Sequence, residues 1–148
     1  MDSHTATALL EATCPGQSER FFSPLTIGDT PESADHGAEL ILSGVKTATS
    51  SAFWDYPDGR IPFAGALSLL LGAHARPRAV LETQRIEVLR FGDIDEAFAA
   101  AYGEGDRTLA WFKAEIGAWY RRSAARCGER FTDDTRIICE WFAVARRL

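Results

Sequence analysis

The chain has 148 residues, a length typical of one domain, and its 46% hydrophobic and 11% aromatic residues are enough to form a core. The net charge of −5 argues against nucleic-acid binding through bulk positive charge. No apolar run approaches the ~20 residues of a membrane span, and the N-terminus does not resemble a signal peptide. We therefore expect a cytoplasmic protein with no membrane partner.

The cysteines and the distribution of charge limit the kinds of site that this protein can contain. Cys14, Cys127 and Cys139 are too scattered for a disulfide framework, and the histidines do not cluster with them, so we expect free thiols and no structural zinc. Seven acidic residues and one arginine precede Lys46, whereas nine basic and seven acidic residues follow Ala100. An anionic ligand would therefore meet a local basic patch rather than a basic molecule.

The first predicted segments lead up to Lys46. Weak periodicity over residues 1–20 predicts a mobile or loosely docked N-terminal arm with a short helical turn, ahead of a single domain over 21–148. Residues 31–43 predict a helix, because Thr30 can cap it, proline suits its first position and Gly44 suits a left-handed stop. Lys46 then enters an extended segment rich in threonine and serine.

Two strands and their loops come next. Residues 55–62 predict a loop from two prolines and an Asp-Gly turn. Residues 66–71 are nearly all apolar and predict a buried strand, and residues 79–89 alternate in part. These two strands are expected to form a hairpin.

The C-terminal part predicts two helices and a strand. Residues 93–102 predict a short helix stopped by Gly103, and a longer helix with one apolar face follows Asp106. Residues 136–144 predict the last strand. The order of elements indicates an α+β fold in which helices cover a sheet or barrel.

The segment from Gly44 to Ser51 is the strongest candidate site. Lys46 is followed by Thr47, Thr49 and two serines, so an ammonium and several hydroxyls could hold an anion or a carbonyl. If desolvated, Lys46 would lose its proton more easily and act as a base or nucleophile. Spacing alone favours the alternative, a solvated lysine at a helix end followed by an ordinary polar strand.

A second candidate is the run Glu104-Gly105-Asp106-Arg107. Glu104 and Asp106 could orient water, contact a base or bind a divalent ion from a glycine-flanked loop. The alternative is a connection between helices in which Asp106 caps the second helix and Arg107 is solvated. Glu104 has no such structural task, which makes it the more suspect residue.

Single residues elsewhere could also line a site. Most aromatic residues are explained by the core, but Trp54 stands at a loop entry close to Lys46 and could stack on a base. Glu82, on a predicted strand, is either an acid of the pocket or the partner of an arginine.

Two strings together resemble a known family. Ala38 to Thr49 (AELILSGVKTAT) resembles the G-x-K-x-x-T motif of ASCH domains, and Tyr102 to Leu109 (YGEGDRTL) resembles the E-G-x-x-x-L segment of the longer bacterial members. Their order and separation also match. The resemblance covers Phe21 to Leu148.

The resemblance implies a PUA-like β-barrel flanked by helices, with a lysine-centred cleft that binds RNA or a nucleotide or nucleoside. Short members are amidohydrolases that deacylate modified cytidine with a lysine, a threonine and a glutamate, which correspond to Lys46, Thr49 and Glu104. Longer members have been linked to metal-dependent RNA cleavage, which would need a divalent metal cofactor. Residues expected to contact the substrate are Gly44, Ser51, Trp54, Glu82, Asp106 and Arg107.

One position departs from the pattern. Short amidohydrolases have an arginine where this chain has Ser51. We expect either that the missing positive charge changes the ligand or that another arginine, such as Arg107, replaces it. Three hypotheses follow: a binding domain without chemistry, a hydrolase of acylated nucleosides or RNA, and an adaptor that presents its acidic N-terminal arm to a protein.

Overall fold

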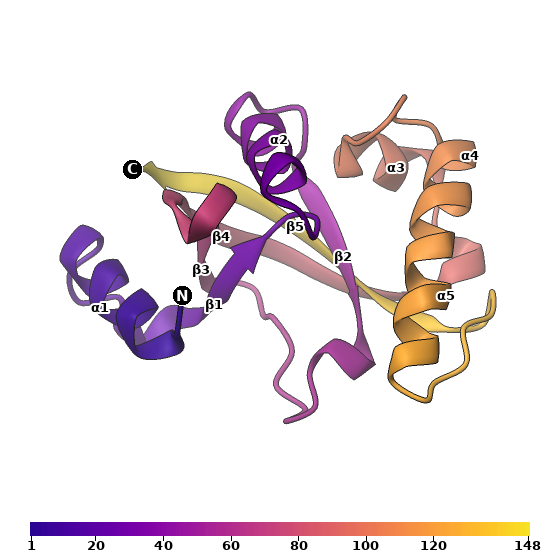
Figure 1. Cartoon of the computed structure of the whole chain (residues 1–148), viewed down its shortest axis with the longest axis horizontal. Coiled ribbons are helices and arrows are strands. Elements are labelled where there is room, and N and C mark those ends of the chain that lie inside the picture. Colours follow the sequence, from indigo (N-terminus) through magenta and orange to yellow (C-terminus); the bar gives the residue numbers. More distant parts are fainter.

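The computed structural model describes all 148 residues and contains a five-stranded sheet with strand order β1-β3-β4-β5-β2 (Figure 1). β1 pairs parallel to β3, and the other pairs are antiparallel. The sheet curls into a half-barrel that stays open between its edge strands β1 and β2. This confirms the predicted α+β class. The strands are β1 (Phe21–Thr26), β2 (Ala48–Ala52), β3 (Leu67–Leu71), β4 (Pro77–Arg90) and β5 (Arg136–Arg147).

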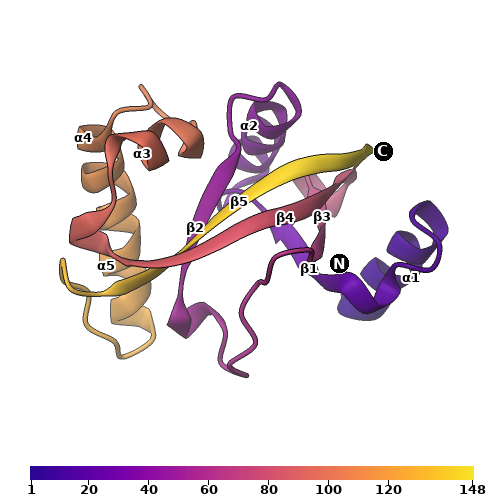
Figure 2. The ribbon, with the colours of Figure 1, turned by 180° about the vertical axis from the view of Figure 1, so that it is seen from behind.

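Helices stand at both ends of the sheet. In Figures 1 and 2, α1 and α2 lie near one end and α3 to α5 near the other, with the long strands β4 and β5 running between them. A π-helical turn over Phe112–Ile116 joins α4 to α5, so the three form one helix. The helices are α1 (Ser3–Thr13), α2 (Pro31–Leu42), α3 (Glu96–Tyr102), α4 (Leu109–Trp111) and α5 (Gly117–Arg126).

The buried side chains form separate clusters that match this division. The largest lies between α3, the α4–α5 helix and strands β2 and β5, and it contains Phe91, Phe112 and Tyr120. A second cluster lies under α1, against β1 and β3. The third lies under α2. The ribbon of β4 and β5 therefore connects two differently packed ends of the molecule.

The helix ahead of Lys46 forms as the sequence predicts. The Thr30 side chain accepts a hydrogen bond from the Ser33 amide at 3.1 Å, and the Ser33 hydroxyl oxygen accepts one from the Thr30 amide. Gly44 follows the helix with φ of +81°, in the left-handed region that glycine adopts without steric cost.

The first 26 residues contain more structure than their periodicity indicates. α1 is an eleven-residue helix capped by Asp2, and Ala6 and Leu10 are fully buried against β1 and β3. β1 was not predicted, because Pro24 argues against a strand. β1 is an edge strand, however, where a missing backbone donor is tolerated.

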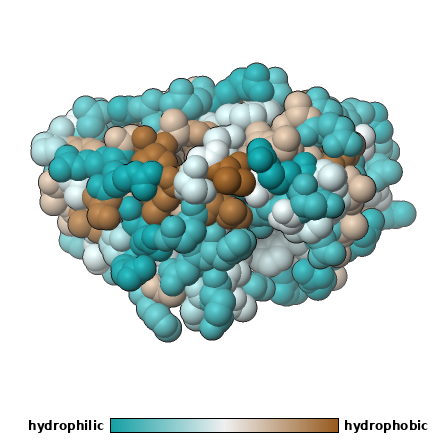
Figure 3. All heavy atoms as spheres, turned by 90° about the horizontal axis from the view of Figure 1, so that it is seen from above, coloured by the Kyte–Doolittle hydropathy of each residue, from teal (hydrophilic) through white to brown (hydrophobic).

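Other boundaries differ in detail. The residue that caps the α4 helix is Thr108, whose hydroxyl accepts from the Trp111 amide, so the prediction that Asp106 caps it is wrong. Asp106 lies before this cap residue, and its carboxylate accepts hydrogen bonds from the backbone amide and the side-chain hydroxyl of Thr108. No helix is long and apolar enough to cross a bilayer. Seen from above, the surface is mostly hydrophilic with small hydrophobic groups (Figure 3).

Candidate functional site

Backbone contacts bring the two motifs together. Gly103 ends α3 with φ of +75°, and a Cβ there would lie 2.5 Å from the Val45 carbonyl oxygen and 2.7 Å from the Lys46 Cα. The Thr47 amide donates to the Ala101 carbonyl at 2.8 Å. The end of α3 is therefore fixed against the chain that joins α2 to β2. This contact places Glu104 beside Lys46.

The Lys46 side chain is fully buried, with 1% of the residue exposed. Its Nζ donates to the Tyr102 carbonyl at 2.9 Å and lies 3.4 Å from the centroid of the Tyr102 ring. It also lies 2.7 Å from Glu104 Oε2. That oxygen is buried, and the positive charge of the Lys46 ammonium stabilises the carboxylate.

Burial and the ion pair act on Lys46 in opposite directions. Burial disfavours the ammonium and lowers the pKa of Lys46 from 10.5 to about 8, although the negative charge of Glu104 opposes this shift. A sizeable share of Lys46 is therefore neutral slightly above neutral pH. The neutral amine can accept a proton, which an ordinary surface lysine does not do at this pH.

A cavity of about 190 Å³ lies in the gap between the edge strands β1 and β2. β1 and the residues after it form one wall, β2 and β5 contribute Thr49, Ser51 and Glu140, and the π-helical turn and α5 close the other side. The lining comprises Leu25, Thr26, Ile27, Gly28, Thr49, Ser50, Ser51, Tyr56, Tyr102, Glu104, Ile116, Trp119, Tyr120 and Glu140.

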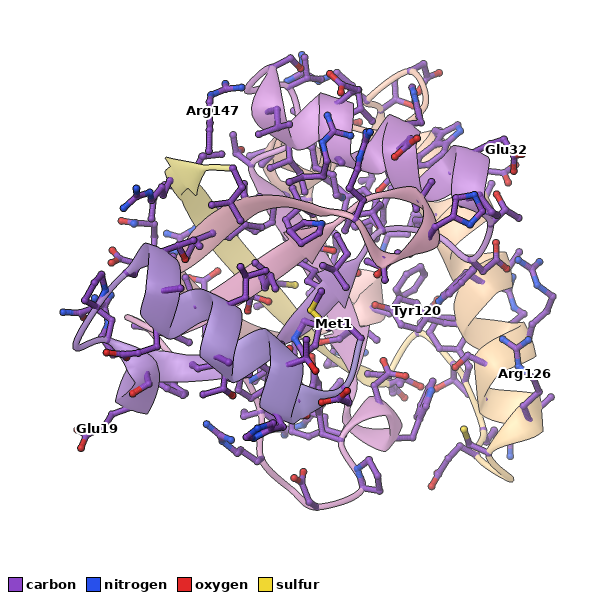
Figure 4. The ribbon with its side chains drawn as sticks, turned by 60° about the vertical axis from the view of Figure 1, so that its left-hand side comes forward. Met1, Glu19, Glu32, Tyr120, Arg126 and Arg147 are labelled. Atoms are coloured by element: carbon purple, nitrogen blue, oxygen red, sulfur yellow. The ribbon has the colours of Figure 1, made fainter.

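Hydroxyl pairs fix the walls of this cavity. The Ser50 and Tyr120 hydroxyls are 2.7 Å apart, and the Tyr56 hydroxyl donates to Ser51 Oγ at 3.0 Å. Figure 4 shows Tyr120 pointing from α5 toward the sheet. Burial raises the pKa of Tyr56 and of Tyr120, so both stay neutral and keep their hydroxyl protons.

Glu140 is the second carboxylate of the cavity, and it was not predicted. It lies opposite Thr49 in the β2–β5 register and accepts a hydrogen bond of 2.5 Å from the Thr83 hydroxyl. Burial raises its pKa, whereas the Thr83 hydrogen bond lowers it. The signal in the sequence was a lone acid within the apolar run from Ile137 to Phe142.

The open edge of β2 adds backbone groups. The Phe142 amide donates to the Thr47 carbonyl, but the Ala52 amide donates to Asp55 Oδ2 instead of β5. Hydrogen-bonding directions alternate along an antiparallel strand. The N–H and C=O of Ser50 therefore point away from β5, toward the gap that holds the cavity.

The three residues expected to be catalytic lie close together but differ in access. Thr49 and Glu104 line the cavity, as does Ser51. Lys46 does not line the cavity and contacts Glu104 on the side away from it. Glu104 and Tyr102, which do line the cavity, therefore stand between Lys46 and the cavity space.

Five residues expected to contact the substrate lie outside the lining. The Trp54 indole donates a hydrogen bond to Ser123 Oγ, and its ring packs edge-to-face with Tyr120 in the core. Glu82 pairs with Arg20, the alternative considered for it. The remaining three have structural tasks: Gly44 ends α2, Asp106 binds Thr108, and Arg107 donates to the Ala100 carbonyl.

The chemistry of the lining is that of hydrogen-bond acceptors and neutral hydroxyls. It contains two carboxylates and no lysine or arginine. No cation in the lining therefore replaces the arginine that short amidohydrolases have at the position of Ser51. No three histidine, cysteine or acidic residues stand together as metal ligands would.

The ASCH domain family model matches residues 23–146. The chain is similar to an ASCH domain from Lactobacillus crispatus JV V101, with 26% identity, a TM-score of 0.83 and coverage of 97% of this chain and 94% of that one. It is also similar to a protein from Enterococcus faecalis V583, with 23% identity, a TM-score of 0.81 and coverage of 98% and 95%. A comparison with curated proteins gave no match. The family model spans most of the chain, so this protein belongs to the ASCH domain family.

Proposed function

We propose that this domain binds the base of a nucleoside, a nucleotide or a single unpaired RNA residue in the cavity between β1 and β2. The observation that supports this most strongly is the lining, which combines the carboxylates Glu104 and Glu140 with aromatic walls and contains no cation. Such a lining disfavours a phosphate group. It suits a flat ring whose edge donates hydrogen bonds.

The size of the cavity points to the same class of ligand. Drug-sized ligands occupy pockets of roughly 300–1,000 Å³. At about 190 Å³, this cavity has room for one ring system but not for a whole nucleotide. The sugar and phosphate would then stay outside, where solvent and surface side chains meet them.

The arrangement of donors and acceptors indicates how a base is held. Carboxylates accept hydrogen bonds from exocyclic amines, as acidic side chains do from cytosine N4. The free Ser50 amide and carbonyl offer a further donor and acceptor. Trp119 and Tyr56 supply aromatic surface, and stacking contributes about 1–3 kcal/mol per base.

The test is a titration of the four ribonucleosides, followed in amide spectra of ¹⁵N-labelled protein. We expect at least one amino-bearing nucleoside to shift the resonances of Thr49, Ser50 and Ser51, and its binding to be nearly independent of salt. Glu104→Gln should weaken binding. Glu82→Gln, a carboxylate outside the cavity, is the matched control. Absence of cavity shifts with all four nucleosides would refute the proposal.

A second function, hydrolysis of an acyl group on the exocyclic amine of such a base, rests on the buried contact between Lys46 and Glu104. A lysine with a pKa of about 8 lies 2.7 Å from a glutamate that reaches the cavity. Glu104 would take a proton from water as the water attacks the acyl carbon. The proton would then pass to the leaving nitrogen as the C–N bond breaks, yielding a carboxylic acid and the free amine.

In that reaction Lys46 is a positioning residue that holds the Glu104 carboxylate in place, and Thr49 orients the acyl group. The assay is release of acetate from N4-acetylcytidine, with wild type, Lys46→Ala, Thr49→Val and the Glu82→Gln control. Turnover in wild type and the control, with loss in the other two, supports catalysis. Binding without turnover would leave a binding domain. Parallel assays on RNA with and without divalent metal test phosphodiester cleavage, which the acidic lining disfavours.

A further inference from the structure

Beside the cavity lies a group of aromatic side chains that the proposed base-binding function does not use. Tyr56 forms part of the cavity wall, and its ring centroid is 5.8 Å from that of Phe22. The Phe22 ring meets Phe63 edge-on at 6.3 Å. We call Phe22, Phe63 and Arg60 the aromatic platform.

The platform has an exposed surface and a free cation. Phe63 is 40% exposed, so one part of its ring is accessible to a ligand. The Arg60 guanidinium lies 5.4 Å from the centroid of the Phe22 ring and donates to the Phe21 carbonyl at 3.0 Å. No carboxylate forms an ion pair with Arg60, so its charge is available to a phosphate.

We propose that the aromatic platform binds the nucleotide next to the one whose base occupies the cavity, and that the preferred ligand is therefore a single-stranded oligonucleotide rather than a free nucleoside. This inference rests on the proposed function. Phe63 would stack on the second base, and Arg60 would contact the phosphate that joins the two nucleotides.

Continuity and charge favour this occupant over a peptide or a membrane. Phe22 of the platform contacts Tyr56 in the cavity wall, so the platform adjoins the cavity and lies within reach of a nucleotide bonded to the one inside it. The cavity excludes phosphate, whereas Arg60 stands outside it and accepts one. Aromatic rings combined with a cation are the usual means by which proteins bind single strands without sequence preference.

The test compares free nucleosides with the corresponding homotrinucleotides of RNA by calorimetry. We expect a trinucleotide to bind more tightly than its nucleoside. Phe63→Ala should weaken trinucleotide binding about tenfold while leaving nucleoside binding unchanged. Phe53→Ala, which removes another exposed aromatic residue outside the platform, should change neither.

Salt dependence tests Arg60 separately. Arg60→Gln should make the slope of log affinity against log salt less steep by about 0.7 for a trinucleotide, the value for one phosphate contact on a single strand. Arg122→Gln, at an exposed site on α5, is the matched control. If nucleosides bind but Phe63→Ala and Arg60→Gln behave as wild type toward trinucleotides, this inference is wrong and the proposed function stands. If no nucleoside binds the cavity, the proposed function itself fails.

Discussion

Replacing Lys46 by methionine tests the state of the buried lysine directly. The change keeps the length of the side chain and removes its charge. In wild type the folded chain holds this lysine with a pKa of about 8, whereas the unfolded chain has the ordinary value of 10.5. Between these values the unfolded state binds more protons, so the stability of wild type must rise with pH.

The size of the effect follows from the two pKa values. Between about pH 7 and about pH 9.5, Lys46 should add about 2 kcal/mol to the free energy of unfolding of wild type. Lys46→Met lacks this contribution. Subtracting its curve from that of wild type cancels the titrating groups that do not contact Lys46.

The assay is urea unfolding of both proteins at several pH values, and a direct measurement supports it. The chain has only two lysines, Lys46 and Lys113, so selective ¹⁵N labelling of the side-chain amines yields two titrating signals. Lys113→Met identifies which signal belongs to which residue. A wild-type minus Lys46→Met difference that stays flat with pH, together with a Lys46 signal that titrates near 10.5, would refute the reasoning.

Three further predictions concern residues around the site and the core. Gly103→Ala should lower the free energy of unfolding by several kcal/mol, because its Cβ would meet the Val45 carbonyl. Gly128→Ala, with φ of +70° and open space around it, should cost about 1–2 kcal/mol, and melting curves of the pair compare them. Thr83→Val removes the donor to Glu140 and should raise the pKa of that carboxyl further, which its ¹³C carboxyl shift reports. Leu10→Ala should cost about 2–5 kcal/mol in urea unfolding, since Leu10 is a residue of α1 that is fully buried against β1 and β3; an unchanged midpoint would mean that α1 does not contribute to folding.

Local signals predicted much of the fold. The cap at Thr30, the stop at Gly44 and the left-handed Gly103 act within a few residues, and each lies where its residue type indicates. α1 and β1 were missed because tertiary contacts define them: α1 buries only two positions, and β1 contains a proline that only an edge strand accepts.

The candidate site was predicted in part for a related reason. Lys46, Thr49 and Glu104 belong to motifs, and the contact at Gly103 joins those motifs in space. Glu140 lies far along the chain, and only the β2–β5 register places it opposite Thr49. Trp54 was expected near the cavity from its position in the sequence, but the 3-10 turn after β2 directs it against Ser123 and Tyr120.

The bulge between Thr83 and Arg85 in β4 has a mechanical consequence. It interrupts the long ribbon of β4 and β5 between the two packed ends of the molecule, and Thr83 beside it holds Glu140 in the cavity. Glu140 pairs with Ile86 on the α3 side of the bulge, whereas the cavity wall at residues 25–28 belongs to the other end, so a molecule that touches both would bridge these ends across the interruption. Occupancy would then restrict bending of the ribbon, and slower hydrogen exchange at amides on both sides of the bulge would report it.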